Sequence, residues 1–360
     1  MRREAGEALG FATMTKIDWG AAATVAGRFS GDYPLEGTYH MRRFELDAPG
    51  MVARASEMVA AETGLEIPGA PEVGVITRDQ WVETNIKSFT ALLKPLREAI
   101  EAEGEGPKGL GSLGGLVTGA ELGAVLGFLS KRVLGQYELV LPTGESDVGD
   151  SVFFVGANVL AMERQHEFRP SHFRFWVALH ESAHRAQFTG VPWMRGYFLS
   201  LVDELVDTNR SEPGKLNRIA HDVRDAMDKG ESPGGDAGIL GLLASREQRE
   251  VLDKVQALMT LLEGHGHVVM DRIGEREIVD VDRMSRVLSA RRNDSKNAAM
   301  MKLIGMDMKL KQYETGGRFI KQVEKLASWD ALSAAWEAPE ALPTLAEIED
   351  PASWLSRVRS

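Results

Sequence analysis

The most informative part of this 360-residue chain is the stretch Phe173–Phe188, which reads Phe-Arg-Phe-Trp-Val-Ala-Leu-His-Glu-Ser-Ala-His-Arg-Ala-Gln-Phe. It contains His180, Glu181 and His184 in the pattern H-E-x-x-H. Positions i and i+4 of a helix lie on one face, about one turn apart. If the stretch is helical, the two imidazoles can therefore reach the same metal ion.

The residues around the motif predict that helix. Ser171 after Pro170 is a suitable N-cap, and Gly190 followed by Pro192 is a suitable end. Apolar residues recur between these ends at helical spacing, so the histidines lie on or beside the inward face. The alternative is a buried helix with two hydrogen-bonded histidines. It is disfavoured because two buried imidazoles and a carboxylate need partners.

The motif also predicts a reaction. Zinc binds histidine nitrogen at about 2.0–2.1 Å, and a catalytic zinc site has three protein ligands and one open position. Glu181, beside the first ligand, can reach a metal-bound water and act as general base when that water attacks a carbonyl. A metal that only holds helices together needs no base, so Glu181 favours hydrolysis over a binding or assembly role with a structural or vestigial metal site.

Composition narrows the class of protein further. The formal net charge of −11 argues against nucleic-acid binding. The chain has no cysteine, which excludes disulfides and thiolate metal sites, and its N-terminus has two early arginines without an apolar segment behind them. We therefore expect a cytoplasmic protein without a signal peptide.

The pattern of apolar residues predicts an α+β fold that is predominantly helical, with a small sheet. Predicted strands cover residues 73–76, 136–141 and 151–155. Predicted helices cover residues 17–30, 48–63, 77–103, 158–164, the motif stretch, 191–209, part of 210–236, 245–271, 281–292 and 296–327. We expect a break or kink at Pro95 in the third of these, and an interruption near Gly316 and Gly317 in the last. Residues 31–46 are expected to be irregular, and the tail to run over the surface with its tryptophans docked. We expect residues 1–134 to form an N-terminal helical part and residues 135–360 to carry the metal site, packed together as one compact unit.

A long apolar run at residues 116–134 resembles a membrane helix at first sight. Glu121 lies in the middle of the run, and Lys131 and Arg132 cut it short of the roughly 20 apolar residues that a membrane span needs. Gly119, Gly123 and Gly127 recur at every fourth position. This stripe is more typical of a buried helix that a neighbouring helix approaches closely, and we expect no membrane span. The glycine-rich residues 104–115 before the run, and residues 226–238, are expected to be loops that can cover a cleft.

The third metal ligand must come from outside the motif stretch, because the extension H-x-x-G-x-x-H is absent, with Gln187 and Gly190 in its places. Glu263 is the first candidate, since a carboxylate inside an apolar run is unusual for a core helix. Gly264 and Gly266 have no side chains, so the helix that carries Glu263 can approach another backbone closely. His267, one turn after Glu263, is an orienting partner or an alternative ligand. Glu204 is the rival carboxylate, although its acidic cluster is more typical of a solvated helix face.

Several segments resemble one known family. They are residues 134–137 (Leu-Gly-Gln-Tyr), 154–164, the motif stretch itself, 261–264 (Leu-Leu-Glu-Gly), 311–316 (Lys-Gln-Tyr-Glu-x-Gly) and 342–345 (Leu-Pro-Thr-Leu). The chain resembles, from about Trp19 to the tail, the zincin-like metallopeptidases or hydrolases often found in bacteria that make the deazaflavin coenzyme.

The resemblance implies a zinc metallopeptidase with one Zn²⁺, acting on a peptide or amide. Glu263 matches the family's second acidic motif, which usually reads Glu-x-x-x-Asp, as in gluzincins. His267 stands here in place of that aspartate. A donor is also needed for the oxyanion that develops during hydrolysis. Tyr313, Tyr197 and His265 are the candidates, with Tyr313 first because it lies in a family-like segment, although packing is the more common role for each.

Overall fold

The computed structural model describes residues 18–31, 33–94, 111–141, 149–206, 246–292 and 306–359. The chain divides into two compact units. Unit 1 comprises Met1–Arg54 and Gly69–Glu181, and unit 2 comprises Ala55–Pro68 and Ser182–Ser360. The division at residue 134 stays a prediction.

Unit 1 contains the three-stranded sheet, made of β1 (Glu72–Ile76), β2 (Gly135–Glu138) and β3 (Ser151–Val155). The order is β1-β3-β2, with β1 parallel to β3 and β2 antiparallel to β3. All three predicted strands are present, and the fold is predominantly helical, as expected. Strand β3 occupies the centre because its apolar side chains are buried on both faces of the sheet, as its burial pattern shows.

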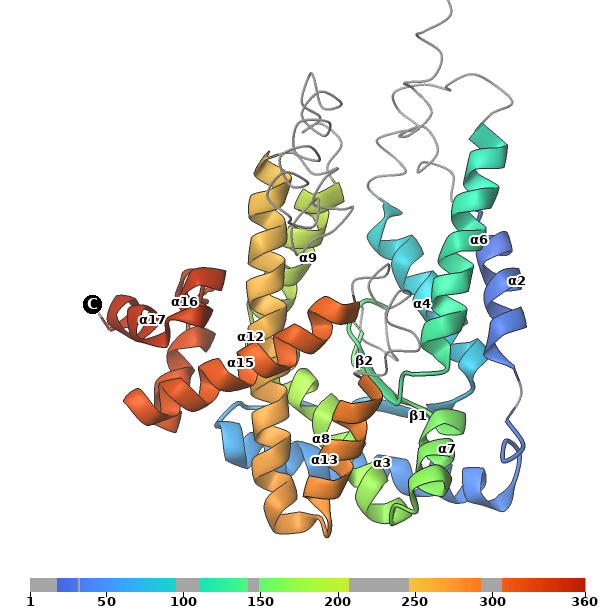
Figure 1. Ribbon diagram of the computed structural model, residues 1–360, viewed down its shortest axis with the longest axis horizontal. Helices are drawn as coiled ribbons and strands as arrows, with labels where there is room; N and C mark the ends of the chain where they lie inside the picture. Colours follow the sequence, from blue (N-terminus) through green and yellow to red (C-terminus); the bar gives the residue numbers. More distant parts are fainter. Residues whose placement is uncertain are drawn as a thin grey trace, which may run out of the picture. The chain divides into compact units, whose positions relative to one another are not determined.

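Helices α2 (Trp19–Ser30) and α6 (Gly111–Ser130) lie side by side in unit 1 (Figure 1). The glycine stripe of α6 makes this possible. A Cβ atom at Gly123 would lie 2.9 Å from the Cα atom of Ala22, and one at Gly127 would lie 3.1 Å from that of Ala26. The predicted close approach of a second helix is confirmed. Residues 111–115, expected to be a loop, belong to α6.

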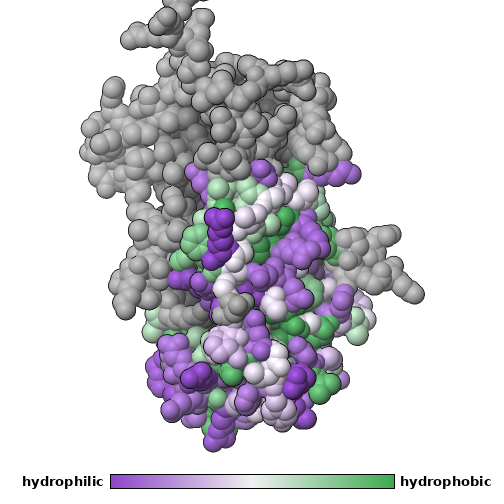
Figure 2. Space-filling model, turned by 90° about the vertical axis from the view of Figure 1, so that its right-hand side faces the viewer, coloured by the Kyte–Doolittle hydropathy of each residue, from purple (hydrophilic) through white to green (hydrophobic). Residues whose placement is uncertain are grey.

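None of the helices in the described part of the chain is long and apolar enough to cross a membrane. Hydrophilic and hydrophobic residues are interspersed over the described residues that face the viewer in Figure 2.

Helix α3 (Tyr39–Thr63) begins before the predicted start at residue 48, so the expectation that residues 31–46 are irregular was wrong from residue 39 onward. Pro49 lies inside this helix. Helix α4 (Arg78–Leu92) opens with a capping box: the Thr77 side chain accepts from the Gln80 backbone N–H, and the Gln80 side chain accepts from the Thr77 backbone N–H. Helix α7 (Gly156–His166) then leads from β3 toward the motif helix.

The motif helix is α8 (Pro170–Thr189), which begins at the proline, one residue before the predicted cap. Proline suits the first helical position because its missing N–H has no partner there in any case. The inward face of α8 is closely packed: Phe173, Trp176, Val177 and Leu179 are buried. The motif residues are therefore held on a helix whose orientation is fixed by its core side chains.

Unit 2 is built on α9 (Met194–Val206), α12 (Arg246–Glu277), α13 (Val281–Arg292) and α15 (Met306–Leu326). Helices α12 and α15 cross at two glycines (Figure 1). A Cβ at Gly264 would lie 2.5 Å from the Cα of Gly316, and one at Gly316 would lie 2.9 Å from the Cα of Gly264. The predicted interruption at Gly316–Gly317 was wrong: α15 is continuous there, because the crossing itself requires a residue without a side chain.

The tail is made of short helical segments. It contains two 3₁₀ segments, η4 (Trp329–Trp336) and η5 (Pro339–Ala341), followed by α16 (Leu345–Glu349) and α17 (Pro351–Val358). Its tryptophans are docked as expected: Trp354 is fully buried, stacks edge-on against Phe319 and donates a hydrogen bond to the Ala341 carbonyl.

Other predictions fall outside the described residues. These concern the kink at Pro95, the loop at 104–110, residues 210–236, the covering loop at 226–238, the first residue of the helix predicted at 245–271 and the helix at 296–305.

Candidate metal centre

Helix α8 carries all three motif residues. His180 and His184 are half-buried, while Glu181 is only 5% exposed. Because α8 is one continuous helix, the two imidazoles are fixed one turn apart, with Glu181 turned about 100° around the axis from His180.

The carboxylate of Glu181 is packed against the backbone of β2. A Cβ atom at Gly135 would lie 2.6 Å from Glu181 Oε1 and 2.9 Å from its Cδ atom. Real side chains do not tolerate contacts this short, so a side chain at position 135 would push the Glu181 carboxylate aside. Glycine at this position leaves room for the carboxylate as the structure has it.

Glu263 is brought to the motif by α12. Its side chain is 1% exposed, and its Oε2 atom lies 3.6 Å from His184 Nε2. His180, His184 and Glu263 each offer a ligand atom within 4.8 Å of the other two. Two ligands at about 2.0–2.2 Å from a zinc ion, at the tetrahedral angle, lie roughly 3.3–3.6 Å apart. The donor set, and the 3.6 Å between His184 Nε2 and Glu263 Oε2, therefore fit a zinc ion.

A buried glutamine orients the second histidine. Gln187 Oε1 lies 3.0 Å from His184 Nδ1, on the ring edge opposite the cluster. The Gln187 amide nitrogen donates to the Leu262 carbonyl at 2.9 Å and lies 3.1 Å from His265 Nδ1. Gln187 is fully buried, so no solvent competes for these bonds.

His265 is a buried, neutral histidine behind the cluster. Burial lowers its pKa to about 3, with a further contribution from the nearby His184. Its ring stacks on Trp329, with centroids 5.9 Å apart, and meets Trp336 edge-on at 5.0 Å. Both tryptophans belong to the 3₁₀ segment η4, which thus contacts the imidazole through one stacked and one edge-on ring.

The comparison with known families fits this geometry. The family described as zincin-like metallopeptidase matches residues 17–355. The chain belongs to this family. A solved structure similar to this zincin-like chain is a crystal structure from Chloroflexus aurantiacus, described as a candidate hydrolase with a novel fold. The two share 28% identity over 95% of this chain and 99% of that one, with a TM-score of 0.69. No curated protein matches the chain.

The predicted resemblance to zincin-like metallopeptidases is confirmed, and the link to deazaflavin-producing bacteria stays a prediction. Among the alternative site residues of this zincin-like chain, Glu204 lies on α9 and is not in the cluster. Burial, then the charges of Glu204 and Glu340, raise the pKa of Tyr197, which places Tyr197 in their acidic surroundings. His267 faces along its own helix, with Nε2 3.5 Å from Asp271 Oδ2. Tyr313 lies on α15, and its side chain is outside the described set.

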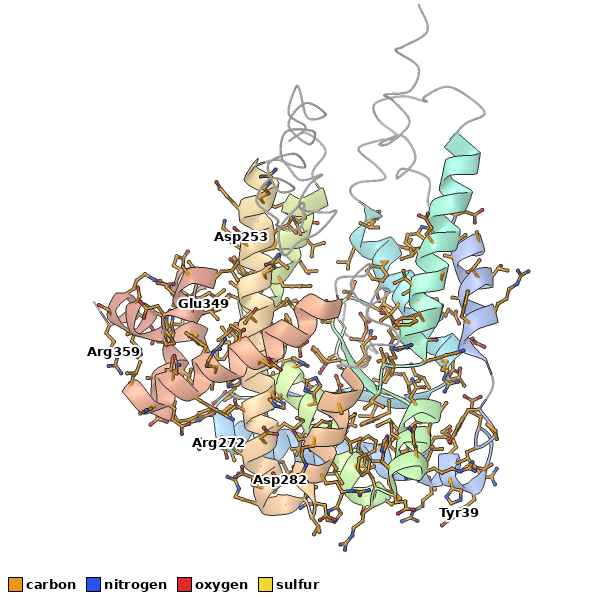
Figure 3. The ribbon with its side chains drawn as sticks, in the orientation of Figure 1. Tyr39, Asp253, Arg272, Asp282, Glu349 and Arg359 are labelled. Atoms are coloured by element: carbon orange, nitrogen blue, oxygen red, sulfur yellow. The ribbon has the colours of Figure 1, made fainter. Side chains whose placement is uncertain are left out.

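An ionic network lies along α12 beyond His265. Arg272, labelled in Figure 3, contacts Glu62 at 2.5 Å and Glu324 at 2.7 Å, and its guanidinium covers Trp329 at 4.4 Å. Arg276 adds a second contact to Glu62 at 2.7 Å. Burial raises the pKa of Glu62, but the hydrogen bonds and charges of the two arginines outweigh it, and the net pKa is lowered. The network fixes the tryptophan that stacks on His265.

Sequence reasoning missed two residues of this zincin-like site. Gln187 was noted only as a mismatch to an extended motif, although it follows His184 by three positions and so shares its helix face. That spacing was the available signal. Gly135 had no local signal, because its role depends on a strand that is adjacent to Glu181 only in the fold.

Proposed function

We propose that this protein is a zinc-dependent metallopeptidase or amide hydrolase, with His180, His184 and Glu263 as the ligands of one Zn²⁺. The observation that carries the proposal is the cluster itself: two imidazoles from α8 and a carboxylate from α12 lie within 4.8 Å of one another. Two imidazoles and a carboxylate are a donor set that suits zinc. Three protein ligands leave a position for water or substrate.

Zinc, when bound, supplies a Lewis acid that lowers the pKa of a water molecule to about 7 and polarises the scissile carbonyl. Glu181 is the general base. It accepts the proton that the water loses as its oxygen bonds to the carbonyl carbon, and delivers a proton to the amine as the carbon–nitrogen bond breaks. Burial of Glu181, the residue after His180, supports this role, because its carboxylate is shielded from solvent where Gly135 leaves room for it.

Metal analysis of the purified protein tests the ligand set. The wild-type chain is expected to hold one zinc ion, and His184→Ala and Glu263→Ala to lose it. Two matched controls are His172→Ala, a histidine on the same helix, and Glu204→Ala, the rival carboxylate. If Glu204→Ala loses the metal while Glu263→Ala retains it, the carboxylate ligand has been assigned wrongly.

Hydrolysis tests the base. Glu181→Gln keeps the size of the side chain and one hydrogen-bonding oxygen but cannot accept a proton. Zinc content and thermal stability should match the wild type, while turnover of any peptide cleaved by the wild type should fall by roughly 10²–10⁴-fold. Unchanged turnover would exclude Glu181 as the base. If the zinc-loaded wild type cleaves no member of a broad peptide library, the binding or assembly role becomes the better explanation.

A further inference from the structure

We propose that Gln187 is a positioning residue that holds His184 in the tautomer with its proton on Nδ1, and that the Leu262 carbonyl keeps Gln187 in the orientation this requires, with His265 accepting its second N–H bond. The inference deepens the proposed metal site and rests on it for its consequence, zinc affinity. The tautomer itself is a property of the protein without metal, so it can be tested separately.

The first step is the orientation of the Gln187 amide. The oxygen and nitrogen of an amide are assigned from their hydrogen-bond partners. One end of this amide lies 2.9 Å from the Leu262 carbonyl oxygen, which can only accept a hydrogen bond. That end must be the –NH₂ group. The reversed amide would set two oxygens against each other in a site where Gln187 is 0% exposed.

The second step concerns His184. With the amide nitrogen directed at Leu262, Gln187 Oε1 is the atom 3.0 Å from His184 Nδ1. An amide oxygen only accepts, so Nδ1 must carry the proton. The lone pair of the neutral ring is then on Nε2, the atom that lies 3.6 Å from Glu263 Oε2 in the cluster. The carbonyl of Leu262 thus determines, through Gln187, which nitrogen of His184 is available to a metal.

The third step concerns His265. An –NH₂ group has two N–H bonds, and Leu262 accepts only one of them. His265 Nδ1, at 3.1 Å, is placed to accept the other. Trp329 and Trp336 fix the His265 ring, so this acceptor cannot turn away without displacing η4. Both N–H bonds and the oxygen of the amide are therefore engaged. Reversal would break the contact to Leu262 whatever the histidine tautomers, because a carbonyl oxygen can only accept.

Nuclear magnetic resonance of the metal-free wild-type protein tests the tautomer directly. Long-range ¹H–¹⁵N spectra of a histidine-labelled sample distinguish a protonated ring nitrogen from an unprotonated one, and His184→Ala identifies the signal. His184 is expected in the Nδ1–H form. A predominant Nε2–H form in the folded protein would overturn the proposal without any mutation.

Zinc affinity, measured by competition with a chromophoric chelator, tests the consequence. Gln187→Met keeps the length of the side chain but removes its hydrogen bonds, and should weaken zinc binding by roughly 10–100-fold. Gln256→Met, the same substitution at a half-buried position of α12, is the control and should bind zinc like the wild type. His265→Phe keeps an aromatic ring between the two tryptophans but removes the acceptor. It should weaken binding less than Gln187→Met, and His184 should stay in the Nδ1–H form in the metal-free protein, because the Leu262 carbonyl still fixes the amide.

The outcomes separate this inference from the proposed function. If Gln187→Met is folded by circular dichroism and binds zinc as tightly as the wild type, the positioning role is wrong while the metal site stands. If the wild type binds no zinc but His184 is held in the Nδ1–H form, the proposed function fails and the positioning role of Gln187 stands.

Discussion

Substituting Gly264 by alanine should separate the two largest helices of unit 2. The added Cβ would lie 2.5 Å from the Cα atom and 2.7 Å from the carbonyl oxygen of Gly316. Optimal separation between non-bonded heavy atoms is about 3.5–4.0 Å. Because the obstructing atoms are backbone, no side chain can rotate away, and α12 and α15 must move apart by roughly 1 Å at the crossing, to judge from that optimum.

Two effects of the substitution oppose each other. Alanine is favoured over glycine inside a helix by about 1 kcal/mol. Overpacking of a well-packed core costs about 1–3 kcal/mol, and a radial gap of about 0.5–1 Å forfeits a quarter to a half of each dispersion contact at the interface. The interface beside the crossing contains Leu261, Phe319 and Ile320, all fully buried. We therefore expect Gly264→Ala to lower the free energy of unfolding by about 1–2 kcal/mol after the gain in helix propensity.

The same helix offers a matched control two residues away. A Cβ at Gly266 would lie 3.7 Å from both Ala183 Cβ and His184 Cε1, which is ordinary contact. Gly266→Ala should raise the free energy of unfolding by about 0.5–1 kcal/mol, since only the helix-propensity term remains. On α15, Gly316→Ala should destabilise and Gly317→Ala should not, because the nearest atom to a Cβ at Gly317 is 4.0 Å away.

Equilibrium unfolding in urea, followed by circular dichroism in a buffer with a chelator, compares the four variants under metal-free conditions. Opposite shifts of the midpoint for Gly264→Ala and Gly266→Ala are expected. Equal midpoints for this pair would refute the reasoning, because the two substitutions share the same chemistry and the same helix and differ only in what the new methyl group contacts.

Three further predictions concern the site and its support. Gly135→Ala should displace the Glu181 carboxylate, so that peptide hydrolysis falls while zinc content, measured on the same sample, is retained; loss of both would indicate general disruption instead. Glu62→Gln should destabilise the protein above about pH 5, where the ordinary glutamate is ionised. Because the folded pKa of Glu62 is lowered, this difference from wild type should shrink as the pH falls through that pKa, and urea titrations at several pH values would contradict us if the difference grew. Removing zinc with a chelator should lower the melting temperature of the wild type, and added zinc should raise it again in a concentration-dependent way, because zinc binds the folded chain. A melting temperature that does not depend on zinc would contradict us.

Features that depend on local sequence were predictable. The motif helix, the capping box of α4 and the three strands each follow from residues within a few positions of one another. The glycine stripe of α6 correctly indicated a neighbouring helix. Glycine destabilises a helix, so glycine at every fourth position indicates that a second helix lies close to that face. Glu263 was also named from the sequence, because a carboxylate inside an apolar run is unusual, and the fold places it 3.6 Å from His184.

Features that depend on a partner distant in sequence were missed or misjudged. Gly316–Gly317 looked like a helix break because glycine disfavours helices, and only the crossing with Gly264 explains why α15 continues. Residues 39–46 looked irregular, yet Phe44 packs against Phe154 of the sheet, and this tertiary contact extends α3. Gln187 has an ordinary sequence neighbourhood, and its importance arises from the Leu262 carbonyl of another helix.

That carbonyl gives the site an unusual tolerance to change. Every amino acid carries a main-chain carbonyl, so the atom that orients Gln187 does not depend on the identity of the residue at position 262. Substitutions of Leu262 can alter packing, but as long as α12 stays helical they leave this acceptor in place. Substitutions at position 262 would therefore leave the proton of His184 on the same nitrogen. A comparison of side chains among related sequences would give no sign that this position orients Gln187.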